Sequence, residues 1–260
     1  MNNFFNCIVK SNGEVSWKVE INHDKLVQHN GLSTVIREKN KLQFACIKIL
    51  SEDIFEKDLK KWKLKFDDET KPTWWRKTHE NKAYEALKIY LETYILEGVT
   101  IDELKDTYIM AVRNVVIKNM RDNSRIKDMC GKSKVEHMRD NSTIENTRDY
   151  SVIGEMRNCS RIINSRNHSV IGDMWNDSSI YDMWNDSIVE NMWDGSVIYD
   201  VRGNCKVEIM REYSKVINTW DNCVIEHMEE NSKVINMRGY SKVINMEDNS
   251  NIVHTWRNAI

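Results

Sequence analysis

The chain has 260 residues, of which 38 are basic and 40 are acidic, so its formal net charge is −2 at pH 7. A nearly neutral chain has no global field that would attract nucleic acid or anionic lipid. No apolar run reaches the roughly 18 residues of a membrane-spanning helix, and the polar start Met1-Asn2-Asn3 does not look like a secretory signal. We therefore expect a soluble intracellular protein.

The segment 1–110 is predicted to form a small α+β domain. Apolar and β-branched runs predict strands at 4–10, 14–20, 42–50 and 62–66. The first two are joined by Ser11-Asn12-Gly13, a favourable turn for a hairpin. After Pro72, helical spacing of apolar residues predicts a helix over 79–96 that ends before Gly98. The segment 100–103 has a capping-box pattern, which predicts a further short helix leading into the next region.

This domain contains no motif that demands catalysis. Phosphate-binding glycine loops, H-E-x-x-H and C-x-x-C are all absent from the sequence. An acid–base site could be assembled from His23, Asp24, His79 and Glu80, but nothing in their spacing demands it. Their spacing is equally that of surface and helix-start residues, so we do not expect an enzyme and assign no catalytic residue.

The composition changes near residue 110. Every leucine, every phenylalanine and the single proline precede residue 105, whereas 11 of the 13 methionines fall between Met120 and Met246. From Ala111 onward the sequence repeats every nine residues, approximately as M-[RW]-[DNG]-[DNY]-S-x-[VI]-x-x. We number these positions 1 to 9. Position 5 is small, and position 7 is Ile or Val in all 16 complete units, a short fixed period that is typical of a solenoid.

Alternate units differ at position 1, which indicates that two units make one 18-residue coil. Position 1 is Met in every second unit from Met120 to Met246 and varies in the units between. Positions 5 and 7 lie on one side of an extended chain, and Asp, Asn and Gly at positions 2 to 4 favour turns with left-handed backbone. We predict a mainly β fold: a parallel β-solenoid over 111–260, rising about 4.8 Å per coil, after an α+β domain at 1–110.

The repeat resembles the nine-residue repeats of bacterial and phage repeat proteins. Its small-x-aliphatic kernel is distantly similar to that of the pentapeptide-repeat family, some members of which mimic duplex DNA. This resemblance covers 111–260 and implies a solenoid in the cytoplasm of a bacterial or phage-infected cell. The segment 120–260 has 18 basic and 22 acidic side chains, a net charge of −4, which is too small for a DNA mimic.

The cysteines do not form a metal-binding pattern. Cys205 and Cys223 both occupy position 5 and lie two units apart, so we expect them to stack as small core residues with free thiols. A disulfide or a metal site at this pair is the alternative. Cys223 and His227 have the spacing of metal ligands, but Ser and Asn fill the same positions elsewhere. We expect no metal and no cofactor.

Position 2 supplies the candidate partner-binding residues. One column consists of Arg121, Arg139, Arg157, Trp175, Trp193 and Arg211, and the other contains Arg148, Arg166, Trp184, Arg202 and Trp220. In one interpretation these are self-stabilising ladders, in which Trp stacks on Arg and position-3 acids offset the stacked cations. In the other they form a recognition strip for an acidic protein, because Trp and Arg are enriched at binding hot spots.

We favour a non-enzymatic binding or scaffold protein, for example an inhibitor of a host or defence protein. One alternative is a solenoid that binds or mimics nucleic acid, since Arg and aromatic side chains hold single strands. Another is an enzyme with its site in 1–110 and the solenoid as a dimeriser. An uncovered last coil also predicts a homodimer, joined end to end through Met246, Ile252, Trp256 and Ile260.

Overall fold

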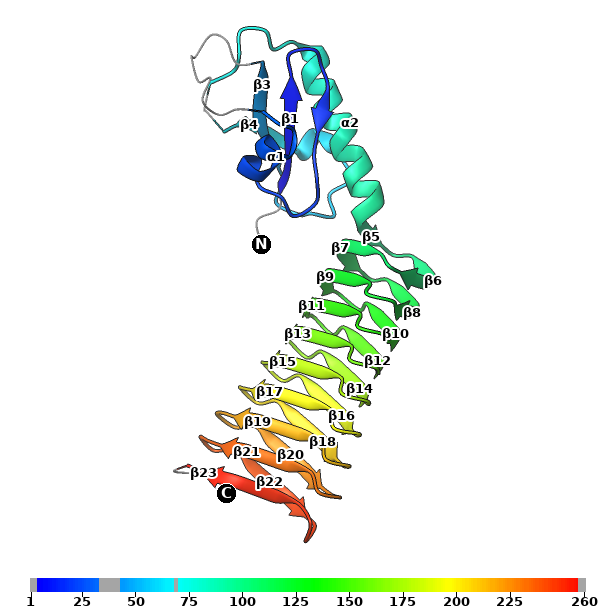
Figure 1. Ribbon diagram of the computed structural model, residues 1–260, viewed down its shortest axis with the longest axis vertical. Coiled ribbons are helices and arrows are strands. Elements are labelled where there is room, and N and C mark those ends of the chain that lie inside the picture. The colour runs from blue at the N-terminus through cyan, green and yellow to red at the C-terminus, as the bar shows by residue number, and fades with distance from the viewer. Residues whose placement is uncertain (1–3, 33–42, 68–69, 257–260) are drawn as a thin grey trace. The chain divides into compact units, whose positions relative to one another are not determined.

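The computed structural model describes residues 4–32, 43–67 and 70–256 and contains two units, Met1–Ile95 and Leu96–Ile260 (Figure 1). The described part of the first unit has an antiparallel sheet in the order β2-β1-β3-β4 and two α-helices. Its elements are β1 (Phe4–Lys10), β2 (Val15–Ser16), α1 (His23–His29), β3 (Phe44–Leu50), the 3-10 helix η1 (Leu59–Lys61), β4 (Lys63–Phe66) and α2 (Lys77–Tyr94). The four predicted strands and the long helix are confirmed, although β2 is shorter than expected. Helix α1 was not predicted.

The sheet of the first unit packs against both helices. Ile8 of β1 lies in one buried cluster with Leu26 and Val27 of α1. Phe5 of the same strand contacts Tyr90 of α2, with 5.2 Å between ring centroids. Successive residues of a strand point to opposite faces, so a single strand contributes to both clusters.

The second unit is a parallel β-solenoid with two sheets, which we call the even and the odd sheet after their strand numbers. The even sheet contains β6 (Thr100–Lys105), β8 (Val116–Arg121), β10 (Lys134–Met138), β12 (Val152–Met156), β14 (Val170–Met174), β16 (Ile188–Met192), β18 (Lys206–Met210), β20 (Val224–Met228) and β22 (Lys242–Met246). The odd sheet contains β5 (Ile95–Glu97), β7 (Tyr108–Arg113), β9 (Arg125–Cys130), β11 (Thr143–Thr147), β13 (Arg161–Ser165), β15 (Ser179–Met183), β17 (Val197–Val201), β19 (Lys215–Thr219), β21 (Lys233–Met237) and β23 (Asn251–Thr255). In Figure 1 these strands follow one another as rungs.

Equivalent residues of successive coils are neighbours along the solenoid. Met138 pairs with Met156, and Met156 pairs in turn with Met174. The 18-residue coil is therefore confirmed. The core consists of position 1, position 5 and position 7, which form one buried cluster along the coils together with Leu104 and Ile109 of the first coil.

At most turns the chain reverses between the sheets through two residues with left-handed backbone. Asp140 and Asn141, at positions 3 and 4, have φ of 55° and 59°. Ser142 closes this turn, because both its backbone N–H, at 3.1 Å, and its hydroxyl, at 2.6 Å, donate to the carbonyl of Arg139. Positive φ at both central residues is the type I′ geometry, in which Asn and Asp are favoured.

The start of the solenoid differs from the prediction. The helix expected at 100–103 is wrong, because these residues belong to β6, where Leu104 pairs with Met120. Residue i therefore pairs with residue i+16 here, in place of residue i+18 as in the later coils. Ala111, expected at position 1, pairs instead with Asp128, while Val112 pairs with Met129. The solenoid thus extends back to about residue 95, and its first coil is shorter than the repeat.

Within the described residues, neither helix combines the length and apolar character that crossing a membrane requires.

Candidate interaction columns at the turns

Position 2 lies between the last core residue of each strand and the turn. Its backbone N–H donates to the position-1 carbonyl of the preceding coil, as from Trp193 to Met174 at 2.9 Å. The position-2 side chains therefore line up along the solenoid. We call the residues that follow even strands the even column, which runs Arg121, Arg139, Arg157, Trp175, Trp193, Arg211, Glu229 and Glu247. The odd column follows odd strands and runs Arg148, Arg166, Trp184, Arg202, Trp220, Arg238 and Trp256.

The middle of the even column is one continuous stack. The indole rings of Trp175 and Trp193 lie 4.8 Å apart and are tilted by only 1°. The guanidinium carbon of Arg157 is 5.5 Å from the Trp175 ring, and that of Arg211 is 4.4 Å from the Trp193 ring. Arg211 also forms an ion pair with Glu229, with 2.5 Å between Nε and Oε2. This column changes from basic to acidic at its last two residues.

The odd column alternates cations and aromatic rings. Arg202 lies between two indoles, 4.7 Å from the ring of Trp184 and 5.6 Å from that of Trp220. Arg238 is 4.4 Å from Trp220 and 5.3 Å from Trp256. Guanidinium groups within about 6 Å of a ring centroid are attracted by the ring quadrupole. The structure thus brings the position-2 candidates together in ordered stacks.

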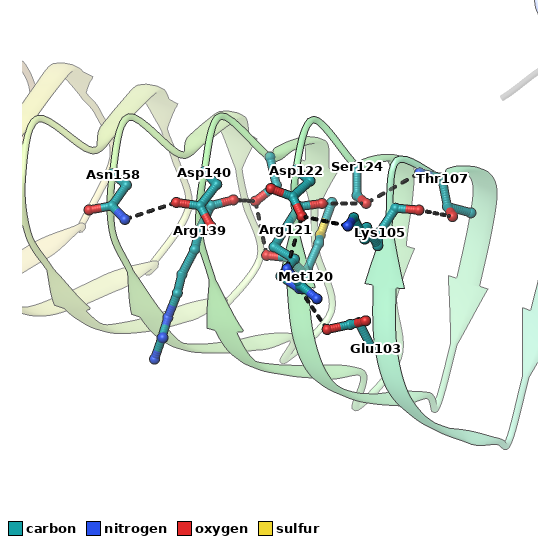
Figure 2. Close-up of polar contacts among 11 residues, drawn as sticks. Glu103, Lys105, Thr107, Met120, Arg121, Asp122, Ser124, Arg139, Asp140 and Asn158 are labelled. Carbon is teal, nitrogen blue, oxygen red and sulfur yellow. Dashed lines mark hydrogen bonds and ion pairs between the residues drawn. The ribbon is translucent and has the colours of Figure 1, made fainter.

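Stacked cations in the first coils are compensated by acids. Figure 2 shows Arg121 turned toward Glu103, at 2.6 Å, and in contact with the position-3 acid Asp122, at 3.0 Å. The hydrogen bond from Arg121 lowers the pKa of Glu103. Asp140, the position-3 acid of the next coil, forms no ion pair among the described residues and accepts a hydrogen bond from Asn158 at 2.9 Å (Figure 2). The hydrogen bond to Glu103 raises the pKa of Arg121, and the charge of Asp140 contributes to this shift. The predicted compensation by position-3 acids is therefore only partly present.

Two cations of the odd column form no ion pair within the part of the chain that the structure describes. Arg166 is exposed and donates to the side-chain carbonyl of Asn164 at 3.3 Å. Arg238 is half-buried between its two indole neighbours. Elsewhere in the column Arg202 has Asp200 within 3.6 Å, and the indole N–H of Trp220 donates to the same carboxylate at 3.1 Å.

The sequence interpretation missed a third column, at position 8 on the outer surface of the odd sheet. We call it the apolar column, and it consists of Ile163, Tyr181, Tyr199, Ile217, Ile235 and Val253. The rings of Tyr181 and Tyr199 are stacked, with centroids 4.9 Å apart. Reading position 8 in steps of 18 would have revealed it, because the equivalent residues of the even sheet from β12 to β20 are Gly154, Gly172, Glu190, Glu208 and Glu226. When position 8 is compared every nine residues, the residues of the odd and the even sheet are mixed and the apolar column is hidden.

The stacked cysteines belong to the core. Cys205 and Cys223 are buried free thiols, and burial raises the pKa of Cys205 to about 12 and that of Cys223 to about 11. The Cys223 thiol donates to the carbonyl of Trp220 at 2.8 Å, the same contact that Ser142 makes at its own turn. His227 lies at position 9 and contacts Asn245 instead. No group of three potential metal ligands occurs among the residues described.

The structure gives separate partners to the four candidate acid–base residues, His23, Asp24, His79 and Glu80. The ring of His23 is hydrogen-bonded to Asp67, and that of His79 accepts from the backbone N–H of Arg76 at 3.0 Å. Glu80 is paired with Lys77 at 2.6 Å, and Asp24 is exposed. Within the described ranges, no hydrogen bond or ion pair joins one of these four residues to another.

The fold and its columns define a repeat protein of the β-solenoid class. Comparison of the chain with protein-family models, with curated proteins and with solved structures found no match.

Proposed function

We propose that this chain is a non-enzymatic binding or scaffold protein whose solenoid presents Arg and Trp side chains to a protein partner. The observation that best supports this is the odd column, in which five successive side chains from Trp184 to Trp256 alternate between indole and guanidinium at contact distance. Inhibition of a host or defence protein is one form that such binding takes.

The stacks favour binding because they order the side chains in advance. Immobilising a rotamer-rich side chain on association costs roughly 0.5–1.5 kcal/mol, and stacked Arg and Trp have already lost much of that freedom. Arg166 and Arg238, which form no ion pair with any described residue, favour an acidic partner surface.

A protein suits these columns better than a nucleic acid does. Single strands are held by bases stacking on open aromatic faces. Both faces of Trp220 are covered by neighbouring guanidinium groups, and Trp175 has its faces toward Arg157 and Trp193. The edges of the rings and the ends of the guanidinium groups remain for contact, and these suit the carboxylates and carbonyl groups of a protein.

We also propose that the last coil is an interface between two copies of the chain. Met246 is 53% exposed, whereas Met237 in the preceding odd strand is 1% exposed. Trp256 is 56% exposed, and Ile252 is half-buried. Among the described residues, β22 and β23 are the terminal strands of their sheets, and each has one edge that no described strand pairs with. Ile260, the fourth residue expected at this interface, lies outside the described residues.

The test is affinity purification of the tagged full chain from a lysate of its native host, followed by quantitative mass spectrometry. The variant Trp184→Ala/Trp220→Ala removes two rings of the odd column, and Tyr213→Ala/Tyr240→Ala removes two exposed turn residues as the control. Circular dichroism verifies that each variant is folded. We expect one protein to be recovered in stoichiometric amount with the wild type and the control, and at least about tenfold less with the Trp variant. Equal recovery with all three chains would refute the proposal.

A further inference from the structure

The apolar column is an exposed hydrophobic strip on a sheet surface. Its members at the two ends and in the middle remain accessible: Ile163 is 38% exposed, Tyr181 41%, Tyr199 40% and Val253 44%. Ile217 and Ile235 continue the strip between Tyr199 and Val253. Isolated apolar residues are common on protein surfaces, but a contiguous apolar strip is characteristic of interaction sites.

Cations without acidic partners flank this strip. Arg161, Lys215 and Lys233, at position 6, lie on one side of it; all three are exposed and form no ion pair among the described residues. Arg166 and Arg238 of the odd column lie on the other side. We define the odd face as positions 6, 8, 9 and 2 of the six coil segments that begin with β13, β15, β17, β19, β21 and β23. It has six cations and two acids, a formal charge of +4.

The equivalent face of the even sheet has the opposite charge. The same positions in the segments that begin with β12, β14, β16, β18, β20 and β22 hold four cations and seven acids, a formal charge of −3. Three of these four cations are already paired: Arg157 with Glu155 at 3.2 Å, Lys206 with Glu208 and Glu226 at 2.9 and 3.0 Å, and Arg211 with Glu229. The unpaired positive charge and the exposed apolar strip therefore occur together on the odd face.

We propose that the odd face binds an amphipathic α-helix of a partner protein, whose apolar stripe lies along the apolar column and whose flanking Asp and Glu side chains meet the two rows of cations. This proposal deepens the proposed function and rests on it. It names the face that the partner covers and the chemistry of the segment that covers it.

The spacing of the column favours a helix over a strand. Adjacent strands place successive side chains of the column about 4.8 Å apart, and one face of a helix presents a side chain about every 5.4 Å. A partner strand lying along the same line presents a side chain on one face about every 6.8 Å. Its side chains therefore fall out of register with those of the column after fewer steps than the side chains of a helix do. Six side chains span roughly 24 Å, which matches a helix of about 16 residues.

The test measures binding of a labelled helical peptide to the full chain by fluorescence anisotropy. The peptide has about 16 residues, with Leu repeating on one face and Glu on both sides of that face. A second peptide replaces Glu by Lys, and a third has a central Pro that breaks the helix. The odd-face variant is Ile217→Glu/Ile235→Glu. Its matched control is Val170→Glu/Ile188→Glu, which changes two half-buried apolar residues of the even face.

We expect saturable binding of the Glu peptide to the wild type and to the even-face control, at least about tenfold weaker binding to the odd-face variant, and weakening as salt is raised. The Lys and Pro peptides should bind at least about tenfold more weakly than the Glu peptide. Failure of the Glu peptide to bind, equal binding of the Lys peptide, or equal binding to both variants would overturn the helix proposal. The proposed function would survive these results if the lysate partner were still lost with the Trp184→Ala/Trp220→Ala variant, and both proposals would fail if it were not.

Discussion

The stacking in the odd column predicts a measurable coupling between Trp220 and Arg238. The guanidinium carbon of Arg238 lies 4.4 Å from the ring of Trp220, and no acid competes for it within the described part of the chain. Both side chains are half-buried, between the exposed and the desolvated limits for cation–π contacts. We therefore expect a coupling free energy of about 1 kcal/mol.

The assay is a double-mutant cycle in urea, followed by far-UV circular dichroism because the chain has nine tryptophans. The single variants are Trp220→Leu and Arg238→Met. Trp220→Leu also removes the hydrogen bond to Asp200, but this loss occurs in both arms of the cycle and cancels.

A second cycle, between Trp220 and Arg166, provides the control. These residues are three coils apart, roughly 14 Å, so their effects should add to within about 0.3–0.5 kcal/mol. A coupling between Trp220 and Arg238 no larger than that of the control would refute the interpretation of the column as a stabilising stack.

Three further predictions concern single positions of the solenoid. Gly239 has φ of 68°, and a Cβ there would lie 2.6 Å from a backbone nitrogen of the neighbouring coil, so Gly239→Ala should reduce the free energy of unfolding by about 2 kcal/mol or more in urea. Gly98→Ala, with φ of 65° but open space around the Cβ, should lose only about 1 kcal/mol, and equal losses would contradict the steric argument. A thiol-reactive disulfide reagent near pH 8 should label exposed Cys159 in the native state. Cys205 should react only on unfolding, because it is buried and its pKa is raised to about 12. Labelling of Cys205 in the native state would show that its coil opens. Sedimentation at tens of micromolar should detect a dimer that Met246→Glu converts to a monomer, and a monomeric wild type would refute the end-to-end interface.

Most of the solenoid was predictable because its period determines its geometry. Once Met156 and Met174 are recognised as neighbours in a stack, the strand positions, the core and the turns follow from the nine-residue pattern. Turn geometry was also predictable, since Asp and Asn tolerate the left-handed backbone that positions 3 and 4 adopt. The position-2 columns were predictable because the pairing of residue i with residue i+18 places equivalent side chains next to one another.

The features that were missed are those that the repeat does not specify. The first coil pairs Leu104 with Met120, at i+16, so a search for nine-residue spacing passes over it and a local capping pattern suggests a helix instead. Helix α1 is a single short segment, His23–His29, too brief to show a clear period, although Asn22 caps it by accepting a hydrogen bond from the backbone of Lys25 at 3.0 Å. The apolar column becomes visible only when position 8 is compared every two units, so that the odd and the even sheet are considered separately.

The position-2 and position-8 columns support a common binding side from independent observations. Core packing imposes no choice at most position-8 residues, because their side chains point outward on both sheets. The exceptions are Gly154 and Gly172, where a Cβ would lie 2.6 and 2.5 Å from a backbone carbonyl oxygen of the preceding coil. From β13 onward the odd sheet nevertheless has apolar residues there, whereas the even sheet has Gly or Glu from β12 to β20 and an apolar residue, Ile244, only in its last strand. Position-2 side chains stack in both columns. The even column nevertheless ends in Glu229 and Glu247, whereas the odd column continues with Arg238 and Trp256. Stability alone would not require the unpaired cations and the exposed apolar residues to gather on the same sheet. Their coincidence on the odd face is the reason to direct the first binding experiments there.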